Sequence, residues 1–174
     1  MSQTEPPSPV PPTPGPPTQG QTLDDVAEFA AALAPSRRLI GIDAGTKTLG
    51  LALSDVSRFI ASPLETIQRT KFTADVTRLL QIAAEHNITG FVLGWPVNLD
   101  GTIGPRAQAT RAFARNVNKL TPLPIFLWDE RLSTAEAERM LIAADASRKR
   151  RADVIDKLAA TIILQGALNR MRHL

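Results

Sequence analysis

Three carboxylates stand where predicted buried segments end or where a helix faces the core. Asp43 closes the apolar run 39–42, and Glu130 follows the apolar run 124–128. Asp156 lies at the border of the apolar stripe of the last predicted helix. Two carboxylates about 4 Å apart repel each other by about 4 kcal/mol at an effective dielectric of about 20, so three acids gathered together require a cation. Ligands that are all oxygen favour Mg²⁺ or Mn²⁺ over zinc.

Basic side chains accompany these acids and indicate the kind of substrate. The densest basic cluster is Arg148-Lys149-Arg150-Arg151, which directly precedes Asp153. Arg106, Arg111 and Arg115 recur along one predicted helix, where they form either a basic rim or an ordinary solvated face. A metal site made of carboxylates beside basic side chains suits the hydrolysis of a phosphodiester by metal-activated water.

The composition excludes several other chemistries. The chain of 174 residues has no cysteine, which excludes thiol catalysis, disulfides and a cysteine-built zinc site and is consistent with a reducing compartment. Its two histidines, His86 and His173, lie in no motif, so a histidine-based triad or zinc site is not expected. There are 20 Lys and Arg against 17 Asp and Glu, and this net charge of +3 permits a nucleic-acid partner without requiring one.

The stretch 39–55 places Asp43 at the bend of a predicted β-hairpin. Its first apolar run ends at Asp43, and leucines then alternate with small residues over 49–54. Gly45 is expected to turn the chain with a positive φ. Gly50 is expected to leave room for a ligand or a neighbouring backbone.

Three other interpretations of this hairpin exist. A P-loop needs Gly-x-x-x-x-Gly-Lys-Thr before a helix, whereas position 46 is Thr and the residues after it have the period of a strand. The Asp-x-Gly-Thr hairpin also resembles the phosphate loop of the actin and sugar-kinase ATPases, but those proteins enclose ATP between two such domains and this chain is too short for both. A third interpretation, in which Asp43 only stabilises a turn, stays open.

The chain divides into three predicted parts. Residues 1–21 are rich in Pro, Ser, Thr, Gln and Gly, which predicts a disordered tail, and they lack the basic start and apolar centre of a secretory signal. Residues 22–36 are predicted to form a short helix, capped by Thr22, and a linker. Residues 37–174 are predicted to form the folded domain.

An α/β domain is predicted for the third part, with a mixed five-stranded sheet of three antiparallel strands and then two parallel strands, flanked by helices. Hydrophobic periodicity predicts the hairpin, an edge strand at 59–67, a helix at 70–86, a strand at 91–94, a helix opening at Gly104-Pro105, a strand at 124–128, a helix at 134–144 behind the capping box Ser133-x-x-Glu136, and a final helix after the basic cluster. Ligands of such sheets bind beyond the carboxyl ends of the strands, so Asp43 and Glu130 are expected to meet there. Asp156 joins them if the last helix packs across the sheet.

Five sequence blocks carry a family resemblance. They are Leu39–Asp55, Val92–Gly101, Gly104–Arg106, Trp128–Ala137 and Val154–Ala160. In order and spacing they resemble the YqgF (RuvX) family, bacterial proteins of RNase H-like fold described as Holliday junction resolvases and as nucleases that mature the 5′ end of pre-16S rRNA. The resemblance spans roughly residues 39–168.

The resemblance implies a set of site residues. The family's catalytic and metal-binding acids fall on Asp43, Glu130 and Asp156. Asp153 is a weaker candidate for this acidic cluster than these three, and Asp129 is interpreted as a structural acid. The candidate substrate-binding cations are Lys47, Arg106, Arg131, Arg148, Lys149, Arg150 and Arg151. Arg131 is expected to brace the site or to contact phosphate. Asp100 lies in the block that resembles the family's loop near the active site, but it is equally consistent with an ordinary Asp-Gly turn.

The function implied by the resemblance is that of a cytoplasmic endonuclease, dependent on Mg²⁺ or Mn²⁺, that processes the 5′ end of pre-16S rRNA. Its expected partners are nucleic acid and ribosomal particles, and no membrane. Two alternatives stay open: resolution of DNA junctions by the same chemistry, and a non-catalytic module that binds nucleic acid or the ribosome. The sequence does not separate RNA from DNA, because backbone phosphates look alike to Lys and Arg, and it predicts no oligomeric state.

Overall fold

The computed structural model describes residues 19–133 and 148–174, with the side chains of the last helix from Ile155 onward. The predicted helix at 134–144 and all but the end of the predicted tail therefore lie outside the described residues. Within the described ranges, no helix is both long enough and apolar enough to span a bilayer.

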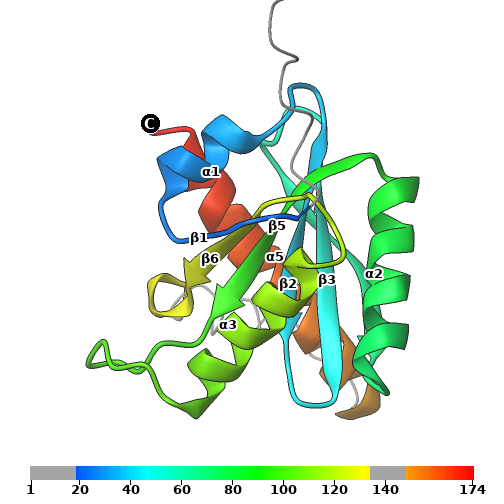
Figure 1. Cartoon of the computed structure of the whole chain (residues 1–174). Coiled ribbons are helices and arrows are strands. Elements are labelled where there is room, and N and C mark those ends of the chain that lie inside the picture. Colours follow the sequence, from blue (N-terminus) through cyan, green and yellow to red (C-terminus); the bar gives the residue numbers. More distant parts are fainter. Residues whose placement is uncertain (1–18, 134–147) are drawn as a thin grey trace, which may run out of the picture.

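A mixed six-stranded sheet forms the centre of the fold, in the order β1-β6-β5-β2-β3-β4 (Figure 1). Its strands are β1 (Thr22–Leu23), β2 (Arg38–Ala44), β3 (Thr48–Ser54), β4 (Ala61–Gln68), β5 (Ile88–Trp95) and β6 (Ile125–Asp129). β2, β3 and β4 are antiparallel neighbours, whereas β2, β5, β6 and β1 are parallel. The predicted mixed α/β sheet is confirmed, and β4 is an edge strand as expected from Pro63.

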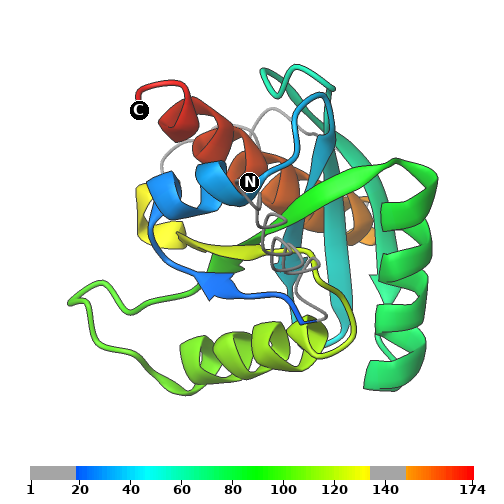
Figure 2. The same ribbon diagram turned by 45° about the horizontal axis from the view of Figure 1, so that its top comes forward.

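Helices cover both faces of this sheet (Figures 1 and 2). They are α1 (Val26–Ala32), α2 (Phe72–Glu85), α3 (Pro105–Asn118) and α5 (Arg148–Met171), with the short 3₁₀ helix η1 (Glu130–Leu132) after β6. Alternate strand residues point to opposite faces. Ile40 and Leu93 accordingly pack with α2 and α3, while Leu39 and Val92 pack with α1 and α5.

The predicted count of five strands is wrong by one, and the cause lies at residues 22–25. Thr22 does not cap a helix but belongs to β1, which pairs in parallel with β6. The N–H of Ile125 donates to the carbonyl of Gln21 at 2.8 Å. The helix begins later, after Asp25, whose side chain accepts the N–H of Glu28 at 2.9 Å. A strand of two residues exists only through its partner, so no local periodicity reveals it.

Glycines on the strands let α5 cross the sheet at close range. A Cβ on Gly41 would lie 2.6 Å from the Cβ of Leu164, and a Cβ on Gly50 would collide with the backbone of Asp156. The expectation that Gly50 admits a neighbouring backbone is therefore confirmed. The positive φ expected at Gly45 is wrong, because Gly101 is the glycine with positive φ in the described part of the chain.

Gly50→Ala is expected to destabilise the protein, because the added methyl group displaces α5 from β3. Overpacking of this kind costs about 1–3 kcal/mol. A matched control is Gly45→Ala, whose Cβ would stand 3.2 Å from the carbonyl of Thr48. Chemical denaturation of both variants checks this. Equal stability of the two variants would contradict the close contact between α5 and β3.

Candidate active site

Asp43 stands near the carboxyl end of β2, on the face of the sheet that α5 covers. Its register partner on β3 is Gly50, the residue against which the backbone of Asp156 packs. The absence of a side chain at Gly50 therefore brings Asp156 next to Asp43. These two acids are 113 residues apart in sequence and meet because α5 crosses the hairpin.

Glu130 follows β6 directly, as the first residue of η1. Its side chain extends over the end of β5, where a Cβ on Gly94 would collide with the Oε1 atom of Glu130. Because β5 lies between β6 and β2, the side chain of Glu130 extends over β5 toward Asp43. The predicted meeting of acids at the carboxyl ends of the strands is observed for these two.

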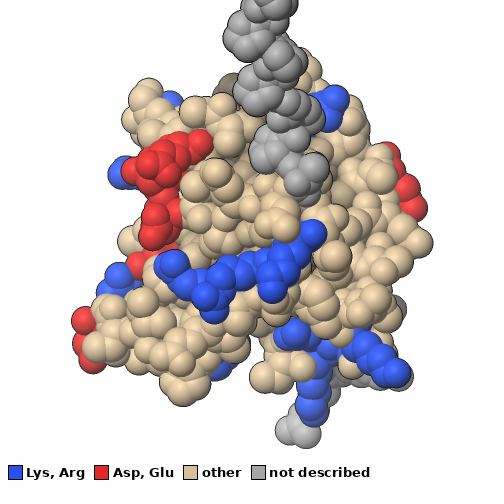
Figure 3. Space-filling model, in the orientation of Figure 1, with Lys and Arg blue, Asp and Glu red and all other residues tan. Residues whose placement is uncertain are grey.

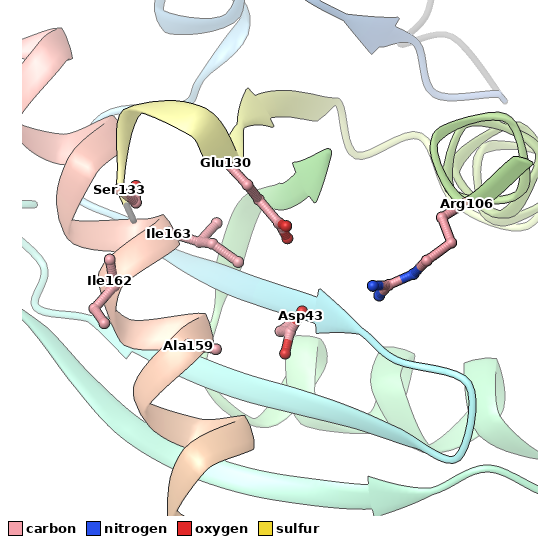
Figure 4. A pocket seen from close by; sticks show the side chains of 7 residues that line it. All are labelled: Asp43, Arg106, Glu130, Ser133, Ala159, Ile162 and Ile163. Atoms are coloured by element: carbon pink, nitrogen blue, oxygen red, sulfur yellow. The ribbon is translucent and has the colours of Figure 1, made fainter. Parts of the chain in front are cut away.

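A pocket of about 320 Å³ contains both carboxylates. It is lined by Asp43, Arg106, Glu130, Ser133, Ala159, Ile162 and Ile163. Figure 4 shows Asp43, Glu130 and Arg106 pointing toward one common space from β2, η1 and α3. The wall opposite Arg106 is apolar and belongs to α5, so the two acids face a cation on one side and hydrocarbon on the other.

Burial and mutual repulsion disfavour the ionised forms of the two carboxylates in this pocket. Burial, and next the charge of Asp156, raise the pKa of Asp43 to about 6, against the opposing effect of Arg106. Burial and the charge of Asp43 raise the pKa of Glu130 to about 7, again opposed by Arg106, while Asp129 adds a smaller increase. Among the described side chains, Arg106 opposes these two increases in pKa but does not cancel them.

Asp156 is held at the side of this pocket. The hydroxyl of Thr48 donates to its Oδ2 atom at 2.8 Å, and its charge acts on Asp43. Asp156 does not line the pocket, and in the part of the chain that the structure describes no three acidic, His or Cys side chains are grouped closely enough to hold a metal ion. The structure thus brings two of the three predicted acids into one cavity and places the third beside it.

Asp129 and Arg131 form a local ion pair. The guanidinium of Arg131 donates to both carboxylate oxygens of Asp129 at 2.6–3.0 Å, and this bonding lowers the pKa of Asp129. Asp129 also accepts the backbone N–H of Arg131 at the start of η1. Asp100 accepts the N–H and the hydroxyl of Thr102, at 2.9 and 2.6 Å, as in the Asp-Gly turn interpretation.

The other predicted cations fall in two places. Lys47 is exposed in the loop between β2 and β3 and does not line the acidic pocket. The backbone at 148–151 forms the start of α5, but the side chains of Arg148, Lys149, Arg150, Arg151 and Asp153 lie outside the described ones. Their roles stay predictions.

Two polar residues near the site were missed in the sequence. Arg69, just after β4, donates to the carbonyl of Gly45 at 2.5 Å and lies over the ring of Phe113 at 5.5 Å. It lines a smaller pocket of about 110 Å³ that also contains Arg106. Thr48, which positions Asp156, was likewise not singled out. Arg69 lies outside the five sequence blocks and Thr48 inside the first of them, and each contacts a segment distant in the chain, so only the fold reveals these contacts.

The six-stranded mixed sheet, the helix α5 that crosses it and the acidic pocket define an α/β protein with a candidate metal-dependent hydrolytic site. The family described as "RuvX: Holliday junction resolvase" matches residues 37–170, and the chain belongs to this family. The resemblance inferred from the five sequence blocks is thereby confirmed.

Relatives and solved structures extend this comparison. A protein of Rhodobacter capsulatus named "Putative pre-16S rRNA nuclease" is 61% identical over 147 residues, which are 84% of this chain and 92% of the relative. A protein of the same name from Beijerinckia indica is 60% identical over 146 residues, covering 84% and 88% of the two chains. The structure of T. thermophilus RuvC with a Holliday junction substrate is 17% identical, with a TM-score of 0.48, over 78% of this chain and 96% of that one.

Proposed function

We propose that this protein is a divalent-metal-dependent endonuclease that processes the 5′ end of pre-16S rRNA in the cytoplasm. The single observation that carries the chemistry is the pair Asp43 and Glu130 in one pocket, both with raised pKa values and facing Arg106. The choice of RNA is supported by the names of the relatives at about 60% identity.

The donor set of the pocket fits a hard divalent cation. Its acidic ligands are all carboxylate oxygens, and their pKa values are raised first by burial and next by mutual repulsion, which a bound cation would offset. Asp43 and Glu130 would hold Mg²⁺ or Mn²⁺, with Asp156 as a further acid beside Asp43. When bound, an ion of this kind lowers the pKa of water and polarises a phosphoryl oxygen.

The chain's own residues supply the remaining functions. Arg106 points into the pocket from α3 and would bind the phosphate next to the cleaved bond. Thr48 holds the carboxylate of Asp156 in place, and the apolar residues Ile162 and Ile163 limit the access of bulk water to the acids. Substrate orientation, water exclusion and charge placement thus come from α3, β3 and α5.

A second candidate is the resolution of four-way DNA junctions, which the description of the family favours. The pocket does not discriminate between the two substrates, because a phosphodiester bond and an activated water are common to both reactions. A non-catalytic module that binds nucleic acid or ribosomal particles is the third candidate.

One competition experiment separates these candidates. The purified full chain with Mn²⁺ is given a 5′ fragment of the 16S precursor and a four-way DNA junction together. We expect cuts in the RNA and little symmetric cutting of the junction, and both products are followed on sequencing gels. Asp43→Asn serves as the control for contaminating nuclease, because it removes one of the pocket's two carboxylates.

The other outcomes have distinct meanings. Paired nicks across the junction with intact RNA would assign the protein as a DNA resolvase. Tight binding of either substrate, without cleavage that depends on Asp43, would assign it as a binding module.

A further inference from the structure

A second basic surface lies on α3, away from the acidic pocket. Arg111 and Arg115 on α3 and Lys119 just after it follow one another at four-residue spacing and line a groove of about 460 Å³, whose other wall is formed by Gln19, Gly20 and Thr22. In Figure 3 a band of Lys and Arg side chains crosses the middle of the face shown. We call this surface, defined by Arg111, Arg115 and Lys119, the α3 groove.

The α3 groove and the acidic pocket lie on opposite flanks of the same helix. The buried stripe of α3, which faces the sheet, consists of Ala107, Thr110, Phe113, Ala114, Val117 and Asn118. At about 100° per residue, the cations of the groove stand about 140–220° around the helix axis from Arg106. Arg106 lines the acidic pocket and none of the three groove cations does.

Small and uncharged residues cover the exposed arc of α3 between these flanks. Ala109, Ala112 and Asn116 lie there. Because the side chains on this exposed arc are short and cations lie on either side of it, α3 can approach a polyanion closely and contact it on both sides.

The groove is firmly built. Two hydrogen bonds join its two walls. The N–H of Gly20 donates to the carbonyl of Asn118 at 3.0 Å, and the hydroxyl of Thr22 donates to the Oδ1 atom of Asn118 at 2.5 Å. Arg111 lies over the ring of Trp95 at 4.7 Å. Its contact with Asp24 is long, at 3.9 Å, and that carboxylate is 72% exposed, so solvent screens most of this opposing charge.

We propose that the α3 groove binds the sugar-phosphate backbone of a second strand of the substrate, while the first strand occupies the acidic pocket. The proposal rests on the nucleic-acid substrate proposed above and narrows it to a duplex beside the cleaved bond. The groove cations are about 6 Å apart along the helix, comparable with the separation of successive phosphates on one strand. A helix about 10–12 Å across fits between the two backbones of the shallow minor groove of A-form RNA or the major groove of DNA.

The test compares duplex and single-stranded RNA of one sequence by fluorescence anisotropy over a salt series. We expect the triple variant Arg111→Gln/Arg115→Gln/Lys119→Gln to lose at least about 10-fold in affinity for the duplex, with its salt slope reduced by about 2–3, since each lost phosphate contact removes about 0.9. Affinity for the single strand should change by less than about 3-fold. The single variant Arg115→Gln, which leaves the contacts of Arg111 with Trp95 and Asp24 in place, should reduce the duplex slope by about 1.

A matched control keeps the change in charge constant. Arg37→Gln/Arg58→Gln/Arg170→Gln removes three cations near the opposite end of the sheet from Asp43, and we expect it to leave the difference between duplex and single strand unchanged. Equal losses on both RNAs would overturn the second-strand assignment, and no loss on either would overturn the groove as a binding surface. If the wild type neither binds nor cleaves nucleic acid, the proposed function itself fails. If the wild type binds and cleaves nucleic acid and the triple variant does so equally well, only the proposed role of the α3 groove fails.

Discussion

Asp43→Asn is expected to reduce cleavage by about 10³-fold or more, and at the same time to stabilise the metal-free protein. The loss of activity follows from the position of Asp43 between Glu130 and Asp156, where it is the acid coupled to both others. The gain in stability follows because a buried carboxylate that repels its neighbours is replaced by a neutral amide. A pKa raised from 3.8 to about 6 corresponds to about 1–3 kcal/mol at neutral pH.

Thermal melts with and without Mn²⁺, beside a cleavage assay, check both parts of this expectation. Glu130→Gln should behave in the same way, and Asp156→Asn should lose activity with a smaller gain in stability because the bond from Thr48 then has a neutral and weaker acceptor. The matched control is Glu85→Gln, an acid that is 61% exposed on α2 and should change neither quantity. If Mn²⁺ stabilised wild type and Asp43→Asn equally, Asp43 would not belong to a metal site.

The second large effect concerns pH, and Glu130 governs it. Its pKa rises from 4.5 in the unfolded chain to about 7 in the folded protein, so between these values the folded state binds the additional proton. The stability contributed by this group is present at low pH and is lost as the pH rises toward 7. The loss amounts to about 3 kcal/mol at most, with a parallel contribution from Asp43 between pH 3.8 and about 6.

The difference between wild type and Glu130→Gln isolates this effect from other acids. Asp55, Glu65, Asp100 and Asp129 have lowered pKa values and contribute the opposite pH dependence to both proteins. We expect the free-energy difference between the two proteins, measured by urea unfolding in a chelator, to grow from about pH 4.5 to about pH 7 and to level off above that. A difference independent of pH would show that folding does not change the pKa of Glu130.

Binding of Mn²⁺ should follow the same titration. Protons compete with the cation for both carboxylates, so the apparent affinity for Mn²⁺ is expected to fall by up to about tenfold per pH unit and per proton below pH 6. Isothermal titration calorimetry measures this fall directly, and Glu130→Gln should show a shallower dependence than wild type.

Local patterns predicted most of the fold. Strands such as β5 and β6 and helices such as α2 and α3 follow from apolar periodicity and from Pro105 at the first turn of α3. The strand β1 was not predictable, because its two residues are ordered by backbone bonds to β6, a segment about 100 residues later.

The acids of the site were predictable for a physical reason that the cations lack. Asp43 and Glu130 each end a buried strand, and the carboxyl ends of parallel strands share one edge of a sheet. Arg69 is held in the smaller pocket beside Arg106 by the carbonyl of Gly45 and the ring of Phe113, contacts that no spacing in the chain encodes. The position of Asp156 beside the pocket depends likewise on how closely Gly50 lets α5 approach.

Asp156 lies on α5, the last helix that the structure describes. The three acids can therefore meet only after α5 has been synthesised. Asp43 and Glu130 can be brought together by strands that leave the ribosome early, but Asp156 arrives only when α5 has been synthesised and has docked across β2 and β3. Synthesis proceeds from the amino end, at about 5–20 residues per second. A nascent chain in which α5 has not yet docked across β2 and β3 can therefore bring Asp43 and Glu130 together but lacks Asp156 beside them.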